Sequence, residues 1–159
     1  ERAIVMVRVL DVTMTERNAT EPPLLEALLE VGDSLLTYRR RYQTRIQPHA
    51  VLDPLLADDT NPRSVLFQLT ALATHVRELP REGEIIGPSP EERIVLEALT
   101  AVRLARVGEL ARVDADSQRP ALTELLTQLL IALPALSEAI SQSYLSHAQM
   151  PRQLSRLER

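Results

Sequence analysis

The chain has 159 residues and a formal net charge of −4 at pH 7, with 45% hydrophobic and 25% charged residues. This composition is typical of one globular domain, long enough to remove about 70% of its unfolded surface from water. The negative charge argues against binding to nucleic acid or to an anionic membrane. Because cysteine is absent, disulfides, thiolate nucleophiles and thiolate metal sites are excluded.

We expect a single domain over residues 1–159 and, in the absence of a signal-peptide pattern, a cytoplasmic location. No uninterrupted apolar stretch reaches the ~18 residues that cross a bilayer, so we expect no membrane partner. Helical periodicity runs through most of the chain, and no segment alternates with the period of two that indicates a strand.

The first half of the chain predicts three helices. Residues 1–14 are apolar at nearly every azimuth, which predicts a central helix buried on all sides. They lack a capping residue, so we expect the chain to begin inside a helix. Leucines at helical spacing predict a second helix over residues 22–46. Residues 48–57 predict a short third helix that Pro54 kinks or shortens.

The second half of the chain carries clearer boundary signals. Asn61 and Pro62 predict the N-cap and the first residue of a fourth helix. Residues 80–88 contain two glycines and two prolines, which predicts a flexible loop.

A capping box follows this loop. Ser89 is followed by proline and, three positions on, by Glu92, which predicts the start of a helix that runs to about residue 112. A leucine stripe predicts a last helix over 120–147, and residues 148–159 form a tail. The predicted fold is all-α, a bundle of five to six mostly antiparallel helices without a sheet.

Three consecutive arginines lie between two tyrosines at Tyr38 to Tyr42. On a continuous helix of ~100° per residue, Arg39 falls in the leucine stripe, whereas Arg41 falls on the opposite side and Arg40 between them. A buried arginine keeps its charge and needs carboxylate, phosphate or carbonyl partners. Arg40 and Arg41 are expected on a solvated face.

The predicted first helix offers partners for Arg39. Glu1, Arg8 and Asp11 share one face, and we expect this polar stripe to meet Arg39 in a buried network. The network is either structural, fixing the register of the helices, or a pocket for a ligand's carboxylate or phosphate. Similarly, the start of the fourth helix is either a simple cap or a cradle for an anion. The candidate anion-binding residues are Glu1, Arg8, Asp11, Arg39, Tyr42, Asn61, Arg63 and Ser64.

Other chemistry has no sequence motif. His49, His75 and His147 lie at spacings that do not place two ligands on one helix face, so we expect no metal. The serines lack a Gly-x-Ser-x-Gly elbow, and the four glycines form neither a phosphate-binding loop nor a dinucleotide fingerprint. We therefore predict no cofactor and assign no catalytic residue.

Four stretches together resemble the alpha-E domain family. ERAIVMVRVLD resembles its "LERA…RLLD" helix, TYRRRYQTRI its "YRRRY" helix, LLADDTNPRSVLFQL its "LLLD…NPRSL" connection and LSEAISQSYLSH its "LSDAI…YF" helix. Leu145 stands where the family has an aromatic residue. The family's domains are longer, and the chain resembles their C-terminal half. The motif residues that carry over are Glu1, Arg2, Arg39, Arg40, Tyr42, Asn61, Pro62, Arg63 and Ser64.

The resemblance implies a domain fused to, or encoded beside, a circularly permuted ATP-grasp ligase that forms peptide or amide bonds. We therefore expect a non-catalytic accessory domain that binds a peptide, such a ligase or the rest of its own chain. Two alternatives stay open. One is an enzyme that uses Glu1 or Asp11 with Arg39 to hold an anionic substrate. The other is a homodimerising scaffold.

Overall fold

The structure is a computed structural model that describes residues 1–17, 20–42, 45–80 and 87–144. Over these ranges it contains eight α-helices, one π-helix and no strand, which confirms the all-α class. Most of the loop expected at 80–88 and all of the tail expected at 148–159 lie outside the described residues.

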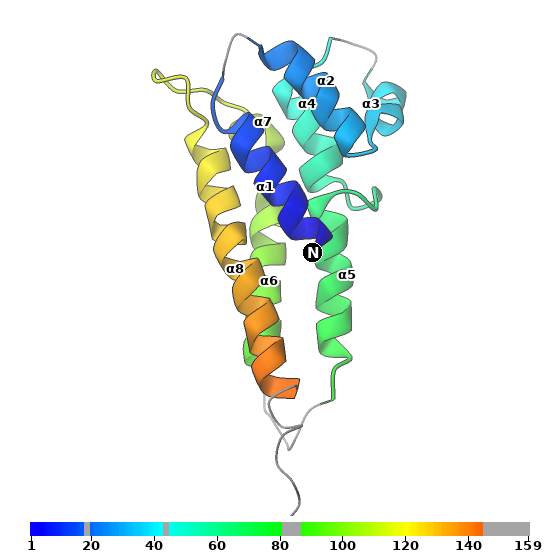
Figure 1. The fold of residues 1–159 in the computed structure, drawn as a ribbon, viewed down its shortest axis with the longest axis vertical. Coiled ribbons are helices and arrows are strands. Elements are labelled where there is room, and N and C mark those ends of the chain that lie inside the picture. The colour runs from blue at the N-terminus through cyan, green and yellow to red at the C-terminus, as the bar shows by residue number, and fades with distance from the viewer. Residues whose placement is uncertain (18–19, 43–44, 81–86, 145–159) are drawn as a thin grey trace, which may run out of the picture.

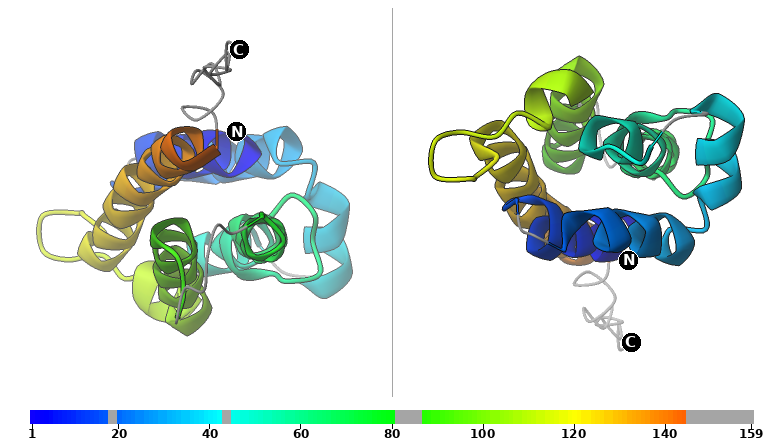
Figure 2. Two further views of the ribbon diagram at one scale, coloured as in Figure 1. Left: turned by 90° about the horizontal axis from the view of Figure 1, so that it is seen from below. Right: turned by 90° about the horizontal axis from the view of Figure 1, so that it is seen from above.

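Four helices form the body of the protein. α1 packs against α5, α5 against α6, α6 against α8, and α8 against α1, which closes a four-helix bundle (Figure 2). Neighbours around this ring run in opposite directions (Figure 1). Fully buried leucines such as Leu10, Leu69 and Leu126 fill the interior. The bounds are Arg2–Met14 for α1, Val65–Arg77 for α5, Pro90–Leu104 for α6 and Pro120–Tyr144 for α8.

Shorter elements gather at one end of the bundle (Figure 1). Buried Leu52, Leu55 and Leu56 extend the core into this end. The segment expected at 48–57 is an α-helix that becomes a π-helix at Asp53. Proline lacks an N–H to donate, so a change of hydrogen-bond spacing beside Pro54 is the interruption that we expected. The bounds are Glu21–Val31 for α2, Leu35–Arg41 for α3, Pro48–Leu52 for α4, Asp53–Ala57 for η1 and Val107–Leu110 for α7.

The prediction of one helix over 22–46 is wrong, because α2 and α3 are separate. Gly32 ends α2, Asp33 takes a left-handed φ of 47°, and Ser34 precedes α3. A Cβ on Gly32 would lie 2.4 Å from Cδ2 of Leu55, so only glycine fits this close approach. The break changes the direction of the helix, so azimuths on a continuous helix do not apply to α3.

The prediction that the first helix is buried on all sides is also wrong. α1 lies at the edge of the bundle and buries one face, with Val7 and Leu10 fully enclosed. Its opposite face leaves Val5 58% and Val12 84% exposed. A groove of about 440 Å³ lies beside its first turn, where Leu72 of α5 and leucines of α8 line the surface.

Of the two helix starts that were predicted from capping residues, one is confirmed and one is wrong. The capping box is confirmed, since Ser89 N donates to Glu92 Oε2 at 3.0 Å and Glu92 N donates to Ser89 Oγ at 3.3 Å. The predicted N-cap of the fourth helix is wrong. Ser64 caps α5, accepting from Phe67 N at 3.0 Å, and Asn61 lies three residues earlier.

α8 is the one helix among the described residues that is long and apolar enough to cross a membrane. In the bundle its leucine stripe packs against α6 and α1, with Leu122, Leu126 and Leu129 fully buried. The core helix of a soluble protein has the same length and composition, so this feature does not by itself indicate a membrane protein.

Candidate functional site

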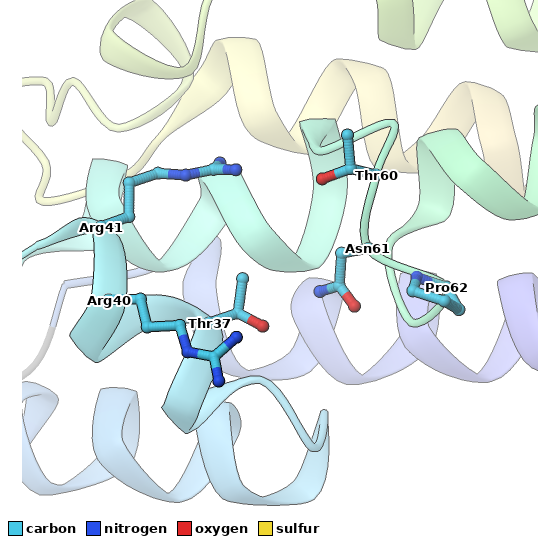
Figure 3. A pocket seen from close by; sticks show the side chains of 6 residues that line it. All are labelled: Thr37, Arg40, Arg41, Thr60, Asn61 and Pro62. Atoms are coloured by element: carbon cyan, nitrogen blue, oxygen red, sulfur yellow. The ribbon is translucent and has the colours of Figure 1, made fainter.

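A polar cleft of about 430 Å³ lies between α3 and the segment that precedes α5. Thr37, Arg40 and Arg41 line one wall, because residues at i, i+3 and i+4 share a helix face. The segment before α5 supplies the facing wall (Figure 3). Its lining residues are Thr60, Asn61 and Pro62.

Arg41 fixes the C-terminal end of α3. Its guanidinium lies 2.5 Å from Oδ2 of Asp53 and 3.0 Å from Oδ2 of Asp58. The Tyr42 hydroxyl donates to the same Asp53 oxygen at 3.0 Å. The Tyr42 ring packs on that of Tyr38 at a centroid distance of 5.4 Å. These contacts attach α3 to η1 and to the residue that follows η1.

Asn61 fixes the other end of α3. Its amide nitrogen donates to Oγ of Ser34, the N-cap of α3, at 2.9 Å and to the carbonyl of Pro54 at 2.6 Å. Its amide oxygen accepts from Arg63 N at 3.2 Å. Asn61 is 7% exposed and Ser34 is fully buried. One side chain therefore connects α3, η1 and the start of α5.

The segment between η1 and α5 is held by its own hydrogen bonds. Oδ1 of Asp58 accepts from the backbone N of Thr60 at 2.9 Å and from its hydroxyl at 2.7 Å. The Ser64 hydroxyl donates to the Asp58 carbonyl. Both walls of the cleft are thus positioned in the absence of a ligand.

The Asp58 carboxyl is almost completely buried, and its acidity reflects competing effects. Burial acts to raise its pKa, but the hydrogen bonds from Thr60 and the charge of Arg41 outweigh burial, so the pKa is lowered. The hydrogen bond to Asp53 raises the pKa of Arg41. Burial and the same carboxylate raise the pKa of Tyr42. At neutral pH, Asp58 is ionised while Arg41 and Tyr42 are protonated.

Arg40 differs from its neighbours in the cleft. It is exposed and, within the described residues, has neither a hydrogen-bond nor an ion-pair partner. Its guanidinium lies near the hydroxyl of Thr37 on the cleft wall (Figure 3). An unpaired guanidinium on the same cleft wall as the Thr37 hydroxyl is suited to bind the oxygens of a carboxylate or phosphate.

The buried network expected around Arg39 is absent. Arg39 is 64% exposed, and its ion-pair partner is Glu26 at 4.0 Å. Glu1 and Arg8 are exposed on α1, Asp11 is half-buried, and none of them pairs with Arg39. The physical reason is the break at Gly32, which removes α3 from the helical phase that placed Arg39 inward.

The buried arginine of the described residues is Arg119, at 1% exposure. Its side chain donates to the carbonyls of Met14 at 2.8 Å and Ala111 at 3.3 Å and forms an ion pair with Glu21. Its backbone N donates to Thr15 O at 2.8 Å. Arg119 therefore joins α1, α2, α7 and α8. No periodic pattern in the sequence indicates this role, because Arg119 lies in an irregular polar segment.

Of the eight predicted site residues, Asn61 lines the cleft. Ser64 and Tyr42 do not line it, but their hydrogen bonds hold its walls in place. Arg63 lies next to the cleft and pairs with Asp33 at 2.9 Å. Sequence reasoning missed Asp53, Asp58, Thr37 and Thr60. Arg41, the partner of Asp53 and Asp58, had been expected on a solvated face.

The fold and the cleft define a class, an all-α domain with an open polar site. Within the described residues no group of three His, Cys, Asp or Glu side chains is arranged to hold a metal ion. The profile of the Alpha-E family, described as a predicted alpha-helical domain with a conserved ER motif, matches residues 1–145. The chain belongs to the Alpha-E family.

The names of the relatives assign no activity to them. The chain is 32% identical over 148 residues to an uncharacterized protein of Mycobacterium bovis and to uncharacterized proteins of two Mycobacterium tuberculosis strains. The match covers 92% of this chain and 16% of each relative. No solved structure matches the chain significantly.

Proposed function

We propose that this domain is a helical binding module that holds an anionic group of a peptide or partner protein in the polar cleft. The observation that carries the proposal is Arg40, an exposed guanidinium on the cleft wall that has no partner in the part of the chain that the structure describes. Because Arg41 and Asn61 already position the walls, binding does not have to order them, which favours affinity.

The local charges favour short-range recognition over long-range attraction. Arg40 and Arg41 contribute two positive charges, and Asp53 and Asp58 contribute two negative charges, so the formal charge of the four is zero. Affinity for an anion then depends on direct hydrogen bonds from Arg40 and the Thr37 hydroxyl, because the Thr60 hydroxyl already donates to Asp58. A simple carboxylate in this open site is expected to bind only weakly, with a Kd in the millimolar range, about −4 kcal/mol.

The biological context of the proposal comes from the family resemblance. Amide-bond formation joins a carboxylate to an amine, so a module that holds a peptide carboxylate fits an accessory role beside a circularly permuted ATP-grasp ligase. The ligand of the cleft would then be a peptide or a segment of the ligase itself. The mycobacterial relatives are several times longer than the chain, which leaves room for such a partner within the same polypeptide.

Nuclear magnetic resonance titration tests the proposal. Sodium acetate and inorganic phosphate are added separately at constant ionic strength, with chloride as the balancing anion. We expect saturable shifts of the Arg40 side-chain N–H and of the Thr37 and Thr60 amides. Arg40→Gln removes these shifts, whereas Arg39→Gln, an equal change of charge on the neighbouring residue, preserves them. Linear shifts that are unaltered by Arg40→Gln would refute the proposal.

The enzymatic alternative depends on Glu1 or Asp11 acting with Arg39, and these side chains do not meet in the structure. The homodimer stays a prediction. It is consistent with the exposed apolar face of α1 at Val5 and Val12. Sedimentation equilibrium distinguishes it, because a homodimer gives a mass that rises with concentration towards twice that of one chain.

A further inference from the structure

A second hollow lies beside the polar cleft. It has a volume of about 310 Å³ and lies between α1, the end of α2 and the start of α5. We call this hollow the apolar groove; it is distinct from the groove of about 440 Å³ that α5 and α8 line. Three valines and one methionine give it an apolar character, and Val31, at 72% exposure, is more open than Val5 at 58%. Charged and polar side chains stand among them. The lining residues are Glu1, Arg2, Val5, Met6, Val9, Val31, Gly32, Arg63 and Gln68.

The linings of the two hollows include residues that are adjacent in the chain. Pro62 lines the polar cleft and Arg63 lines the apolar groove, and their Cα atoms are about 3.8 Å apart along the chain. Arg63 also forms an ion pair with Asp33. On the opposite side, Gly32 lines the groove, and Thr37, five residues later, lines the cleft. The two hollows are therefore lined by neighbouring residues both around the break between α2 and α3 and in the segment before α5.

Resting on the proposed function, we infer that the ligand is a peptide whose carboxylate binds Arg40 in the cleft and whose aliphatic side chain fills the groove beside Val31. The chemistry of the two hollows favours this ligand. Arg40 is complementary to an anion, and the valines are complementary to an apolar side chain. The site of Arg40 has zero local formal charge, so an anion alone gains little, and buried aliphatic surface supplies the missing affinity.

The dimensions of the hollows limit the spacing of these two groups. Pro62 and Arg63, which line the cleft and the groove respectively, are consecutive residues, so an extended peptide of about three residues, roughly 10 Å long, is expected to reach from one space to the other. The carboxylate is therefore expected two to four residues from the aliphatic side chain. It comes either from the C-terminus of the peptide or from an aspartate side chain, and the experiment separates these sources.

The test uses dye-labelled peptides of the form Gly-Gly-Leu-Gly(n), with n from 0 to 5, and measures binding by fluorescence anisotropy. Each peptide is made as the free acid and as the C-terminal amide, and one amide series carries a terminal aspartate. We expect the tightest binding near n of 2 and a loss of about tenfold when the leucine is replaced by serine, roughly the effect of removing one buried aliphatic group. If the aspartate amides bind as tightly as the free acids, a side-chain carboxylate is sufficient for binding.

Two pairs of matched variants assign the two ends of the peptide. Val31→Asn is expected to weaken leucine peptides by about fivefold to tenfold and to leave serine peptides unchanged. The control is Leu104→Asn, which replaces an exposed aliphatic residue of a different helix, α6. It is expected to have no effect on peptide binding. Arg40→Gln is expected to weaken acids but not amides, whereas Arg39→Gln is expected to weaken neither.

The outcomes separate the inference from the proposed function. Suppose Arg40→Gln weakens binding of the free acids, while replacing the peptide leucine or Val31 has no effect on affinity. Binding of the aliphatic side chain in the groove is then refuted, and the anion site stands. If acids and amides bind equally to the wild-type protein, the anion site itself is overturned. Circular dichroism of each variant checks that the surface substitutions leave the fold intact.

Discussion

Arg41 Nη2 lies 3.0 Å from Oδ2 of Asp58, a carboxyl whose side chain is only 3% exposed. Of the three consecutive arginines, this one holds the C-terminal end of α3 in place. Arg39 lies in solvent near Glu26, and Arg40 faces the cleft and has no partner among the residues that the structure describes. One short helix thus places three identical side chains in three environments, and only Arg40 is available to a ligand in the cleft.

Arg41→Gln is expected to destabilise the protein, because it leaves the buried Asp58 carboxylate without its countercharge. The cost is about 1–3 kcal/mol, less than for a fully buried pair, since the Arg41 side chain is 43% exposed. Chemical denaturation measures this change. Arg39→Gln is the matched control, with an expected change within about 0.5 kcal/mol. Equal losses in the two variants would contradict the assigned roles.

Asp58 is expected to make stability depend on pH in acid. Its pKa is lowered in the folded protein, so the unfolded chain binds the proton more tightly. The stabilisation is complete above the ordinary aspartate pKa and is lost as pH falls through the lowered value in the folded state. Urea unfolding from pH 6 to pH 2.5 would show the difference between wild type and Asp58→Asn shrinking in acid. A constant difference would exclude this linkage.

Arg119→Gln is expected to cost about 3–5 kcal/mol, because it leaves Glu21 and two buried carbonyl groups without their donor. Thermal and urea unfolding both measure the loss. Arg112→Gln, an exposed residue of the same connecting segment, is the control and should behave as wild type. A small effect at Arg119 would show that the segment rearranges to restore the lost contacts.

Asn61→Asp tests the connection between the two walls of the cleft. The substitution replaces the amide nitrogen, which donates to Pro54 O and Ser34 Oγ, by an oxygen that faces a carbonyl. We expect a loss of at least about 2 kcal/mol in the free energy of unfolding, larger than for Asn61→Ala, which only removes the bonds. If the alanine variant were the less stable of the two, the assigned orientation of the amide would be wrong.

The helical class and several local features follow from the sequence alone. The leucine stripe of α8 and the capping box at Ser89 combine local propensity with a pattern that packing reinforces. The break between α2 and α3 was missed because the leucines at 28, 29, 35 and 36 continue the helical spacing across it. Gly32 and Asp33 were the available signals, as glycine ends helices and aspartate tolerates a left-handed φ.

The cleft could be predicted only in part. Asn61, Arg63, Ser64 and Tyr42 were proposed as site residues, but the role of Arg39 depended on a helical phase that the break destroys. The pairing of Arg41 with Asp58 joins residues on different elements, and no periodicity encodes such a contact. Arg119 lies in an irregular segment, where the sequence specifies neither a face nor a partner.

The central claim is that Arg40 binds a carboxylate, and a thermodynamic cycle measures it most directly. The dissociation constants of acetyl-Leu-Gly-Gly as free acid and as amide are determined for the wild-type protein and for Arg40→Gln by nuclear magnetic resonance titration. The account predicts a coupling free energy of about 1–2 kcal/mol between guanidinium and carboxylate, typical of a charge-assisted hydrogen bond in a solvent-open site. A coupling of zero, with the acid and amide losing equal affinity in Arg40→Gln, would contradict it.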